Sequence, residues 1–468
     1  MASLSSGINV ALRAVLSQTQ VMEVIEHNVA NANTEGYHKQ SAVLRAVSMS
    51  PSTATYYNYG SGQLGAGVTV SQVQRFTQSF YDTKYRSVAS ENSSWSYQSS
   101  ELTRIEADFG DLSNTGLSTA LDEFWTSWQD LAADPTNSSL RTMVLSDASA
   151  LTNKFNSNSQ SLVALQQDQN TALKDRADEV NSLAKTVADL NYQITQAYSV
   201  NQQPNDLLDS RDLALDRLAE LAGAVSTTQD NGQVIVTING HLLVSGQNTT
   251  ELSTQTDPND ASINQIVWSD NGDTLSPQTG EIGGILKVRD EYIPGQLNAL
   301  NQMAATLIDQ VNTLHSSGYT QDGSDGGNFF SGTDATNISV LDTLTAKDLA
   351  ISSSKTEVGN SDIAAKIYNL RSQKLMNGNS QSIGDYYNDK VTNLALITET
   401  AKTNKSQDST VLDALDEQRQ SVTGVSLDEE AANLTTTQKA YQAAARLMNT
   451  YDEMLDIVIN QMGLVGRS

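Results

Sequence analysis

The sequence lacks cysteine altogether and holds only six prolines and few aromatic residues. Without cysteine the chain cannot form a disulfide scaffold, a thiolate nucleophile or a cysteine-ligated zinc or iron–sulfur site. It also lacks any apolar run near the roughly 18 residues of a membrane-spanning helix, so we expect no membrane insertion. Its first residues show no basic segment followed by an apolar one, so we expect no cleaved secretory signal peptide.

Basic residues are the other shortage, with 28 Lys and Arg against 54 Asp and Glu and a net charge of −26. Such an acidic surface repels phosphate backbones, so we expect no binding of nucleic acid. Acids and bases balance over residues 1–50, and most of the net charge lies on residues 51–415. A near-neutral terminal region can pack closely against copies of itself, while an acidic middle keeps the body soluble.

Glycine and proline are placed so that long helices can form. No glycine lies between Gly116 and Gly223, and a glycine or proline inside a helix would cost about 1 or 3 kcal/mol. Apolar residues recur at steps of three and four from Leu140 to Ile194, which predicts one unusually long helix. A shorter helix is expected over Leu207–Leu221, after Pro204 has closed the first one.

Helical periodicity returns over Ile285–Leu314, with a kink or restart expected at Pro294, and again from about Asp362 onward. Trp125 and Trp128, with the apolar residues around them, most simply form the core of a bundle. These patterns together predict a mainly α protein built as a long helical bundle.

Residues 223–282 have a different character. Val234–Ile238 is a β-branched run between two Asn-Gly dipeptides, which are typical of tight hairpin turns. Ile266–Trp268, with a turn before Thr274-Leu275, predicts a second hairpin. We therefore expect a small β-rich domain inserted into the helical bundle.

Both ends of the chain carry heptad patterns that a single helix cannot bury. The apolar positions are Ile8, Leu12, Val15, Met22 and Val29 near the N-terminus, and Leu427, Leu434, Tyr441, Met448, Leu455 and Met462 near the C-terminus. Either stripe alone could belong to an ordinary core-facing helix. Because both ends carry one, we interpret them as paired coiled-coil helices that bury each other or the stripes of neighbouring subunits, and hence as an assembly interface.

Three domains are expected for a chain of 468 residues. Residues 1–50 with 424–468 are predicted to form a terminal coiled-coil axial domain. Residues 51–222 with 283–423 are predicted to form the helical body, and residues 223–282 the β-rich outer domain.

Two glycine-rich stretches resemble ligand-binding loops. Gly60–Gly65 spells G-x-G-x-x-G, but no apolar strand precedes it, so we expect a flexible turn and no nucleotide. Asp322–Asn328 resembles a calcium loop, yet its twelfth position is Thr333 and not the glutamate of an EF-hand. We expect a solvated turn there, with weak adventitious calcium binding as the alternative.

No other arrangement of residues indicates catalysis. The four histidines are too scattered to propose a metal site, and His315 is expected at a helix C-terminus, where an imidazolium suits the dipole. Glu429 and Glu430 are neighbours on a predicted helix and point in different directions. Ser426 and Glu429 have the spacing of a capping box. We therefore expect no enzyme, no catalytic residue, no cofactor and no metal site.

Both chain ends also resemble a known family. Ser6–Leu12 and Asn28–Tyr37 are similar to the N-terminal signature of bacterial flagellar axial proteins, and Gly424–Leu434 and Ala440–Arg446 are similar to the C-terminal one. The positions that carry this signature are Asn28, Asn31, Asn33, Thr34, Gly36, Tyr37, Asn433, Gln442 and Arg446. Within this group the sequence resembles the FlgK family of hook-associated proteins.

Internal stretches agree with the same family, among them Gln74-Arg75 and Asn205–Asp212. Two positions depart from it. Lys39 stands where the family usually has arginine, and Thr435–Thr437 replaces a bulkier apolar and aromatic stretch. These departures suggest a divergent member whose interface contacts differ in detail.

The resemblance implies a structural subunit at the junction between the flagellar hook and filament, outside the cell. It implies export through the flagellar type III channel without a cleaved signal. The implied partners are copies of the chain in a ring, the hook protein, the second junction protein FlgL, and a FlgN-like export chaperone at the C-terminal helix. Alternatives are another axial protein of the hook or distal rod, or a secreted adhesin or enzyme, which would need a polar, concave site within residues 223–360.

Overall fold

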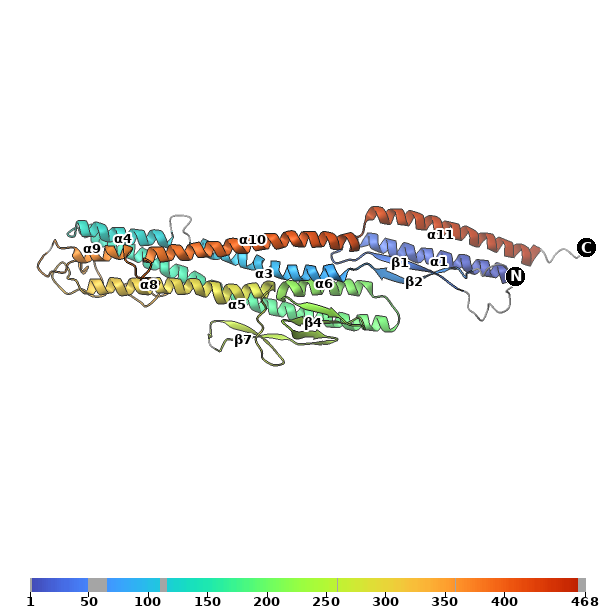
Figure 1. Ribbon diagram of the computed structural model, residues 1–468, viewed down its shortest axis with the longest axis horizontal. Coiled ribbons are helices and arrows are strands. Elements are labelled where there is room, and N and C mark those ends of the chain that lie inside the picture. The colour runs from blue at the N-terminus through green and yellow to red at the C-terminus, as the bar shows by residue number, and fades with distance from the viewer. Residues whose placement is uncertain (1, 49–64, 110–115, 259, 358, 462–468) are drawn as a thin grey trace, which may run out of the picture.

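The computed structural model describes residues 2–48, 65–109, 116–258, 260–357 and 359–461. These residues form an elongated bundle with α1 and α11 side by side at one end (Figure 1). The fold class predicted from the sequence, mainly α with long terminal helices and a small β insertion, is confirmed. In the described part of the chain, no helix is both long enough and apolar enough to cross a membrane.

The helices account for most of the chain. They are α1 (Ala2–Ala30), α3 (Ser79–Phe109), α4 (Leu117–Ala133), α5 (Ser138–Ser199), α6 (Asn205–Ala222), α7 (Gly280–Lys287), α8 (Ile293–Ser316), α9 (Asp362–Asn369), α10 (Ile383–Thr423) and α11 (Leu427–Asp456). Short π-helices cover Val288–Tyr292 and Ile457–Gln461, and a 3-10 turn covers Leu370–Ser372.

The long helix predicted after Leu140 is α5, which runs for 62 residues. Asn137 caps its start by accepting from the backbone amides of Ser139 and Leu140. The shorter helix predicted after Pro204 is α6, and Gly223 ends it in the left-handed conformation at φ 64°. Both predictions are confirmed because spacing and breakers act locally, within a few residues of the helix that they define.

The core of the body lies where α4, α5, α8 and α9 meet. Phe124 and Trp128 are fully buried there and pack against Phe329 and Phe330. The predicted aromatic core is therefore confirmed. Pro294 lies in the first turn of α8, directly after the π-helix Val288–Tyr292. The predicted restart is not seen, because helical backbone continues from α7 through the π-helix into α8; only the hydrogen-bond spacing changes just before the proline.

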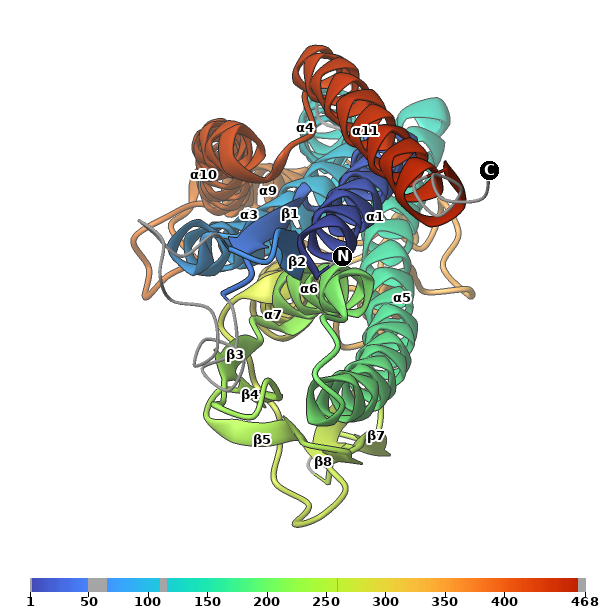
Figure 2. The same cartoon turned by 90° about the vertical axis from the view of Figure 1, so that its right-hand side faces the viewer.

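The strands lie in four small antiparallel groups. They are β1 (Gln40–Ala46) with β2 (Val68–Arg75), β3 (Val225–Thr228), β4 (Val234–Ile238), β5 (His241–Ser245) and β6 (Asn248–Thr249) in that order, β7 (Leu252–Thr256) with β8 (Asn264–Trp268), and β9 (Phe330–Ser331) with β10 (Ser339–Val340). Strands β3 to β8 project from the side of the bundle that faces away from α11 (Figure 2).

The first predicted hairpin is confirmed as β4 and β5, which turn through Asn239 and Gly240, both at positive φ. The second is only partly right. Strand β8 pairs along its length with β7, whereas Thr274 makes a single bridge to Val267. The sequence of β7, LSTQT, is too polar to show an apolar alternation, so its pairing could not be read from it.

Asparagines on α5 attach the β strands to the bundle. Asn170 donates to the carbonyl of Ser262 (2.8 Å) and accepts from the amide of Asn264 (3.0 Å). Asn191 donates to the carbonyl of Val234 (2.9 Å) and accepts from its amide (3.0 Å). Each side-chain amide thus satisfies strand backbone groups that lie at the buried face of the insertion.

Candidate assembly site

Helices α1 and α11 pack against each other along a line of small and polar residues. On α11 the buried positions are Glu430, Thr437 and Ala444, spaced seven residues apart. The line continues to Tyr451, whose ring lies over Gly7 so closely that a Cβ at Gly7 would be 2.6 Å from it. The two helices therefore approach each other closely at this end because glycine leaves room for the ring.

The heptad residues identified from the sequence flank this line. Ile8, Val15, Met22, Leu434, Tyr441 and Leu455 are half-buried, while Leu12, Val29, Leu427 and Met448 are exposed. Met462 lies outside the described residues. The two stripes therefore do not fully bury each other within one chain.

Further apolar side chains on α1, on α11 and on the π-helix that follows α11 face solvent, and the heptad pattern did not select them. They are Leu16, Leu447, Met454, Ile457 and Ile459, between 46% and 62% exposed. Together with the exposed heptad residues, they leave an apolar surface on the terminal helices of a single chain. An apolar surface of this kind is typical of a region that another protein covers.

The N-terminal signature forms the turn that leads from α1 into β1. The side chain of Asn28 is buried, donates to the carbonyl of Gln40 (2.8 Å), and accepts from the amide of Gln40 (3.0 Å) and the hydroxyl of Tyr37 (2.8 Å). Burial, with nearby carboxylates, raises the pKa of Tyr37, so the hydroxyl stays protonated and donates.

The rest of that signature shapes the same turn. Asn31 donates to the carbonyl of His27 (3.0 Å) and accepts from the hydroxyl of Thr34 (3.2 Å). Gly36 has φ +75° and faces Leu213 on α6, while Asn33 is exposed. The signature is thus a helix end followed by a tight turn that sets the direction of β1.

A row of acidic residues on α6 forms a joint with arginines from β2 and α3. Asp209 and Asp212 receive the guanidinium of Arg75 from β2, both at 2.6 Å. Asp212 and Asp216 receive Arg86 from α3, at 3.2 and 2.6 Å. Segments far apart in the sequence are therefore tied to one face of α6.

Arg419, near the end of α10, completes this joint by pairing with Asp82 and Asp216, each at 3.0 Å. Burial alone would favour the neutral forms of these groups, but their opposite charges outweigh it. The pKa of Asp212 is lowered by Arg75 and Arg86, and the pKa of each arginine of the joint is raised. The regular spacing of the aspartates on α6 is visible in the sequence, but nothing in the sequence indicates which arginines pair with them.

Lys39 links the start of β1 to the start of α11. Its Nζ lies 2.8 Å from Glu429 and 3.5 Å from Glu430, and its backbone amide donates to Thr423 at 2.7 Å. Burial lowers the pKa of Lys39, but the two carboxylates raise it by more, so the pKa is raised overall. Ser426 caps α11 as predicted by accepting from the backbone amide of Glu429. The carboxylate of Glu429 pairs with Lys39, so only this half of the expected capping box forms.

The C-terminal signature residues Asn433, Gln442 and Arg446 all lie exposed on α11. Asn433 stands at the rim of a hollow of 300 Å³ between α1, β1 and α11. Gln442 and Arg446 lie further along the helix. The structure thus brings the N-terminal signature into one turn, while it leaves these three side chains on the surface.

The residues considered for chemistry are not brought together. Asp322 accepts from Thr320 and from the backbone amide of Ser324, so the carboxylate closes its own turn. Gly60–Gly65 lies outside the described residues except for Gly65. Within the described ranges, no three His, Asp or Glu side chains are placed to hold a metal ion.

His315 lies near the end of α8, as expected, but the expectation of an imidazolium is wrong. The ring is fully buried, with Nδ1 2.7 Å from the carbonyl of Gly327 and Nε2 3.0 Å from the amide of Ala350. Nδ1 therefore donates and Nε2 accepts, which only the neutral ring can do. Burial lowers the pKa of His315 accordingly.

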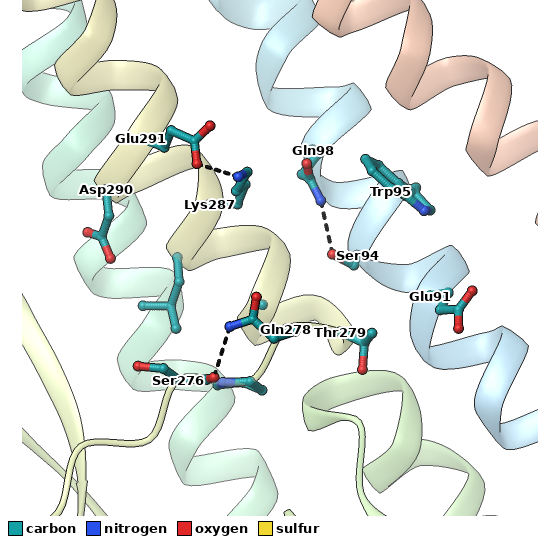
Figure 3. A pocket seen from close by; sticks show the side chains of 13 residues that line it. Glu91, Ser94, Trp95, Gln98, Ser276, Gln278, Thr279, Lys287, Asp290 and Glu291 are labelled. Carbon is teal, nitrogen blue, oxygen red and sulfur yellow. Dashed lines mark hydrogen bonds and ion pairs between the residues drawn. The ribbon is translucent and has the colours of Figure 1, made fainter. Parts of the chain in front are cut away.

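A hollow of 730 Å³ lies between α3 and the segment from α7 to the π-helix (Figure 3). It lies partly within the region where an enzymatic alternative would need a polar site. Lys287 there is paired with Glu291, and Ser94 accepts from the amide of Gln98 at 3.0 Å. Among the described residues that line the hollow, these contacts do not place a serine or threonine hydroxyl against a base that could activate it.

Comparisons with known proteins agree with the resemblance read from the sequence. The family model described as the flagellar hook-associated protein FlgK helical domain matches residues 102–330, and the model described as the flagellar basal body rod FlgEFG protein C-terminal matches residues 417–462. Flagellar hook-associated protein 1 of Bacillus subtilis is 30% identical, with all of both chains covered. The Escherichia coli protein of the same name is 25% identical over 98% of this chain and all of its own.

A solved structure shows the same fold. The flagellar hook junction protein FlgK from Burkholderia pseudomallei aligns with a TM-score of 0.64 at 17% identity. The alignment covers 73% of this chain and all of that one. The long bundle with its inserted strands is therefore an architecture that already has a solved example.

Proposed function

The chain belongs to the FlgK family of flagellar hook-associated proteins, and on that premise we propose that it is a structural subunit of the junction between the flagellar hook and filament. The observation that carries this proposal is the apolar surface that α1 and α11 leave uncovered in a single chain. A subunit that completes its packing against neighbouring subunits needs such a surface.

The arrangement of the chain supports an axial subunit. Its two ends come together in one pair of helices, and the chain between them forms the body and the β strands that project sideways (Figures 1 and 2). In a ring of copies, the paired helices contact one another, and the inserted strands lie away from those contacts. The proposal takes the three domains expected from the sequence as its terminal, body and outer parts.

The partners in this proposal are copies of the chain, the hook protein and the second junction protein FlgL. A FlgN-like export chaperone binds the C-terminal helix before export through the type III channel, without cleavage of a signal. The exposed apolar residues of α11 support a binding role of this kind, since a partner would cover them. The role is structural and not enzymatic, and its location is the extracellular flagellum.

Substitutions on α11 test the proposal. Leu434→Asp and Leu455→Asp place a charge on the proposed interface, and each should abolish incorporation into isolated hook–filament structures and motility. Leu396→Asp is the matched control, because Leu396 is 67% exposed on α10, in the body. Circular dichroism of each purified chain should show an unchanged folded body. Normal incorporation of both α11 variants would refute assembly through these helices.

A further inference from the structure

The hollow between α1, β1 and α11 contains a buried carboxylate that lacks sufficient donors. The side chain of Glu430 is only 2% exposed, and its Oε1 accepts no hydrogen bond from the described residues. Its one ion pair among the described residues is with Lys39, whose Nζ lies 3.5 Å from the same Oε1 and bonds more closely to Glu429, at 2.8 Å. A buried carboxylate oxygen without a hydrogen bond is costly, so this atom calls for a further donor.

The walls of the hollow suit a long basic side chain. Val21, Val24 and Phe76 provide apolar contacts for an aliphatic stem, and Asn433 and Thr436 stand beside them as polar residues. Glu429, Glu430 and Lys39 give the hollow a net negative charge. Arginine matches both features, because its stem packs on apolar surface while its guanidinium can give two parallel hydrogen bonds to a carboxylate.

Arg446 on α11 is a base that its own chain leaves available. It is exposed, and no ion pair involves it among the described residues. It follows the buried Ala444 by two residues, so it points about 200° away from the contact with α1. It also lies 13 positions beyond Asn433, about 20 Å further along the helix, so it cannot fill the hollow of its own chain.

We infer that Arg446 of one copy enters this hollow on the neighbouring copy and hydrogen-bonds the carboxylate of Glu430. The contact joins two different surfaces. One is Arg446, which projects from α11 of the first copy, and the other is the hollow beside the start of α11 of the second copy. Interfaces of this head-to-tail kind close into rings when the rotation between copies allows it. The inference rests on the proposed function and specifies the lateral contact within it.

Cross-linking tests the contact directly, since the chain contains no cysteine of its own. The pair Asn433→Cys with Gln442→Cys retains Arg446 and places one thiol at the rim of the hollow and the other one turn from the arginine. A short bifunctional maleimide added to isolated hook–filament structures should link neighbouring copies into dimers and higher bands. The control pair is Asn433→Cys with Glu453→Cys, two turns beyond Arg446, and it should give monomers.

Charge variants provide a second readout. Arg446→Glu and Glu430→Gln should each lower incorporation at least about tenfold, because each removes one partner of a buried charge pair. Arg446→Lys keeps the positive charge and should retain part of the incorporation. Incorporated protein that cross-links through the control pair, or that tolerates Arg446→Glu, would overturn the inference. Unmodified chain that is absent from hook–filament structures would instead refute the proposed function itself.

Discussion

Asn181 on α5 pairs with both backbone groups of Leu252, the first residue of β7. Its Nδ2 donates to the carbonyl at 2.8 Å and its Oδ1 accepts from the amide at 2.8 Å. Asn170 and Asn191, each about three helical turns away on the same helix, bond to strand backbone in the same way. One helix therefore holds three strand ends through a row of side-chain amides.

The first prediction concerns this row. Asn181→Leu leaves the amide and carbonyl of Leu252 without partners, which should cost about 1–3 kcal/mol locally. Hydrogen exchange over residues 225–268 should become faster, while exchange in α8 stays the same. Asn153→Leu is the matched control, since Asn153 is exposed on the same helix and should change neither. Equal exchange in the two variants would mean that apolar packing alone holds the strands.

The second prediction concerns the joint at α6. Because arginines lower the pKa of Asp212 in the folded chain, its ion pairs stabilise the fold above the unfolded pKa of about 3.9 and lose that effect as pH falls further. Asp212→Asn should cost about 1.5–3 kcal/mol at pH 7. Urea unfolding of both proteins between pH 7 and 3.5 measures the difference in their free energies of unfolding. This difference should become smaller below pH 4.

Asp230→Asn serves as the control for this experiment, because Asp230 is exposed on a turn. Its unfolding midpoint should equal that of wild type at every pH. A loss for Asp212→Asn that persists undiminished at pH 3.5 would show that its carboxylate charge is not the stabilising feature.

The third prediction concerns His315. The folded chain keeps this ring neutral, and the unfolded chain binds a proton below its ordinary pKa of 6.5. Stability should therefore be full above pH 6.5 and fall below it, by up to about 1.4 kcal/mol per pH unit. His315→Gln should have a lower free energy of unfolding than wild type at pH 7.5. Between pH 7 and 5, that free energy should change less with pH than it does in wild type. NMR titration of the ring in the wild type should give a pKa below the ordinary 6.5, and a titration at the ordinary pKa would contradict the assignment.

The fourth prediction concerns the contact of Gly7 with Tyr451. Gly7→Val places methyl groups where the ring lies, so α11 must move away from α1 near the chain ends. We expect faster hydrogen exchange over residues 440–456 and loss of incorporation into the flagellum. Combining Gly7→Val with Tyr451→Ala removes the ring and should restore part of the protection. No recovery in the double variant would argue against a steric cause.

The sequence by itself determined the helices, the first hairpin, the aromatic core and the family. Each of these depends on neighbours in the chain: the steps of three and four in α5, the Asn-Gly turn after β4, the absence of glycine from Gly116 to Gly223. Local periodicity and turn residues act over a few positions, so a single sequence contains the whole signal.

Only the tertiary structure decided which distant groups meet. Arg75, Arg86 and Arg419 come from three elements to the acids of α6, and His315 is neutral because Gly327 and Ala350 enclose it. The contact line of α11 runs through Glu430, Thr437 and Ala444, three residues after the apolar heptad positions. The small residues Thr437 and Ala444 permit a close approach between the helices. Which positions lie in the contact depends on the shapes of both helices, and the spacing within one helix does not show it.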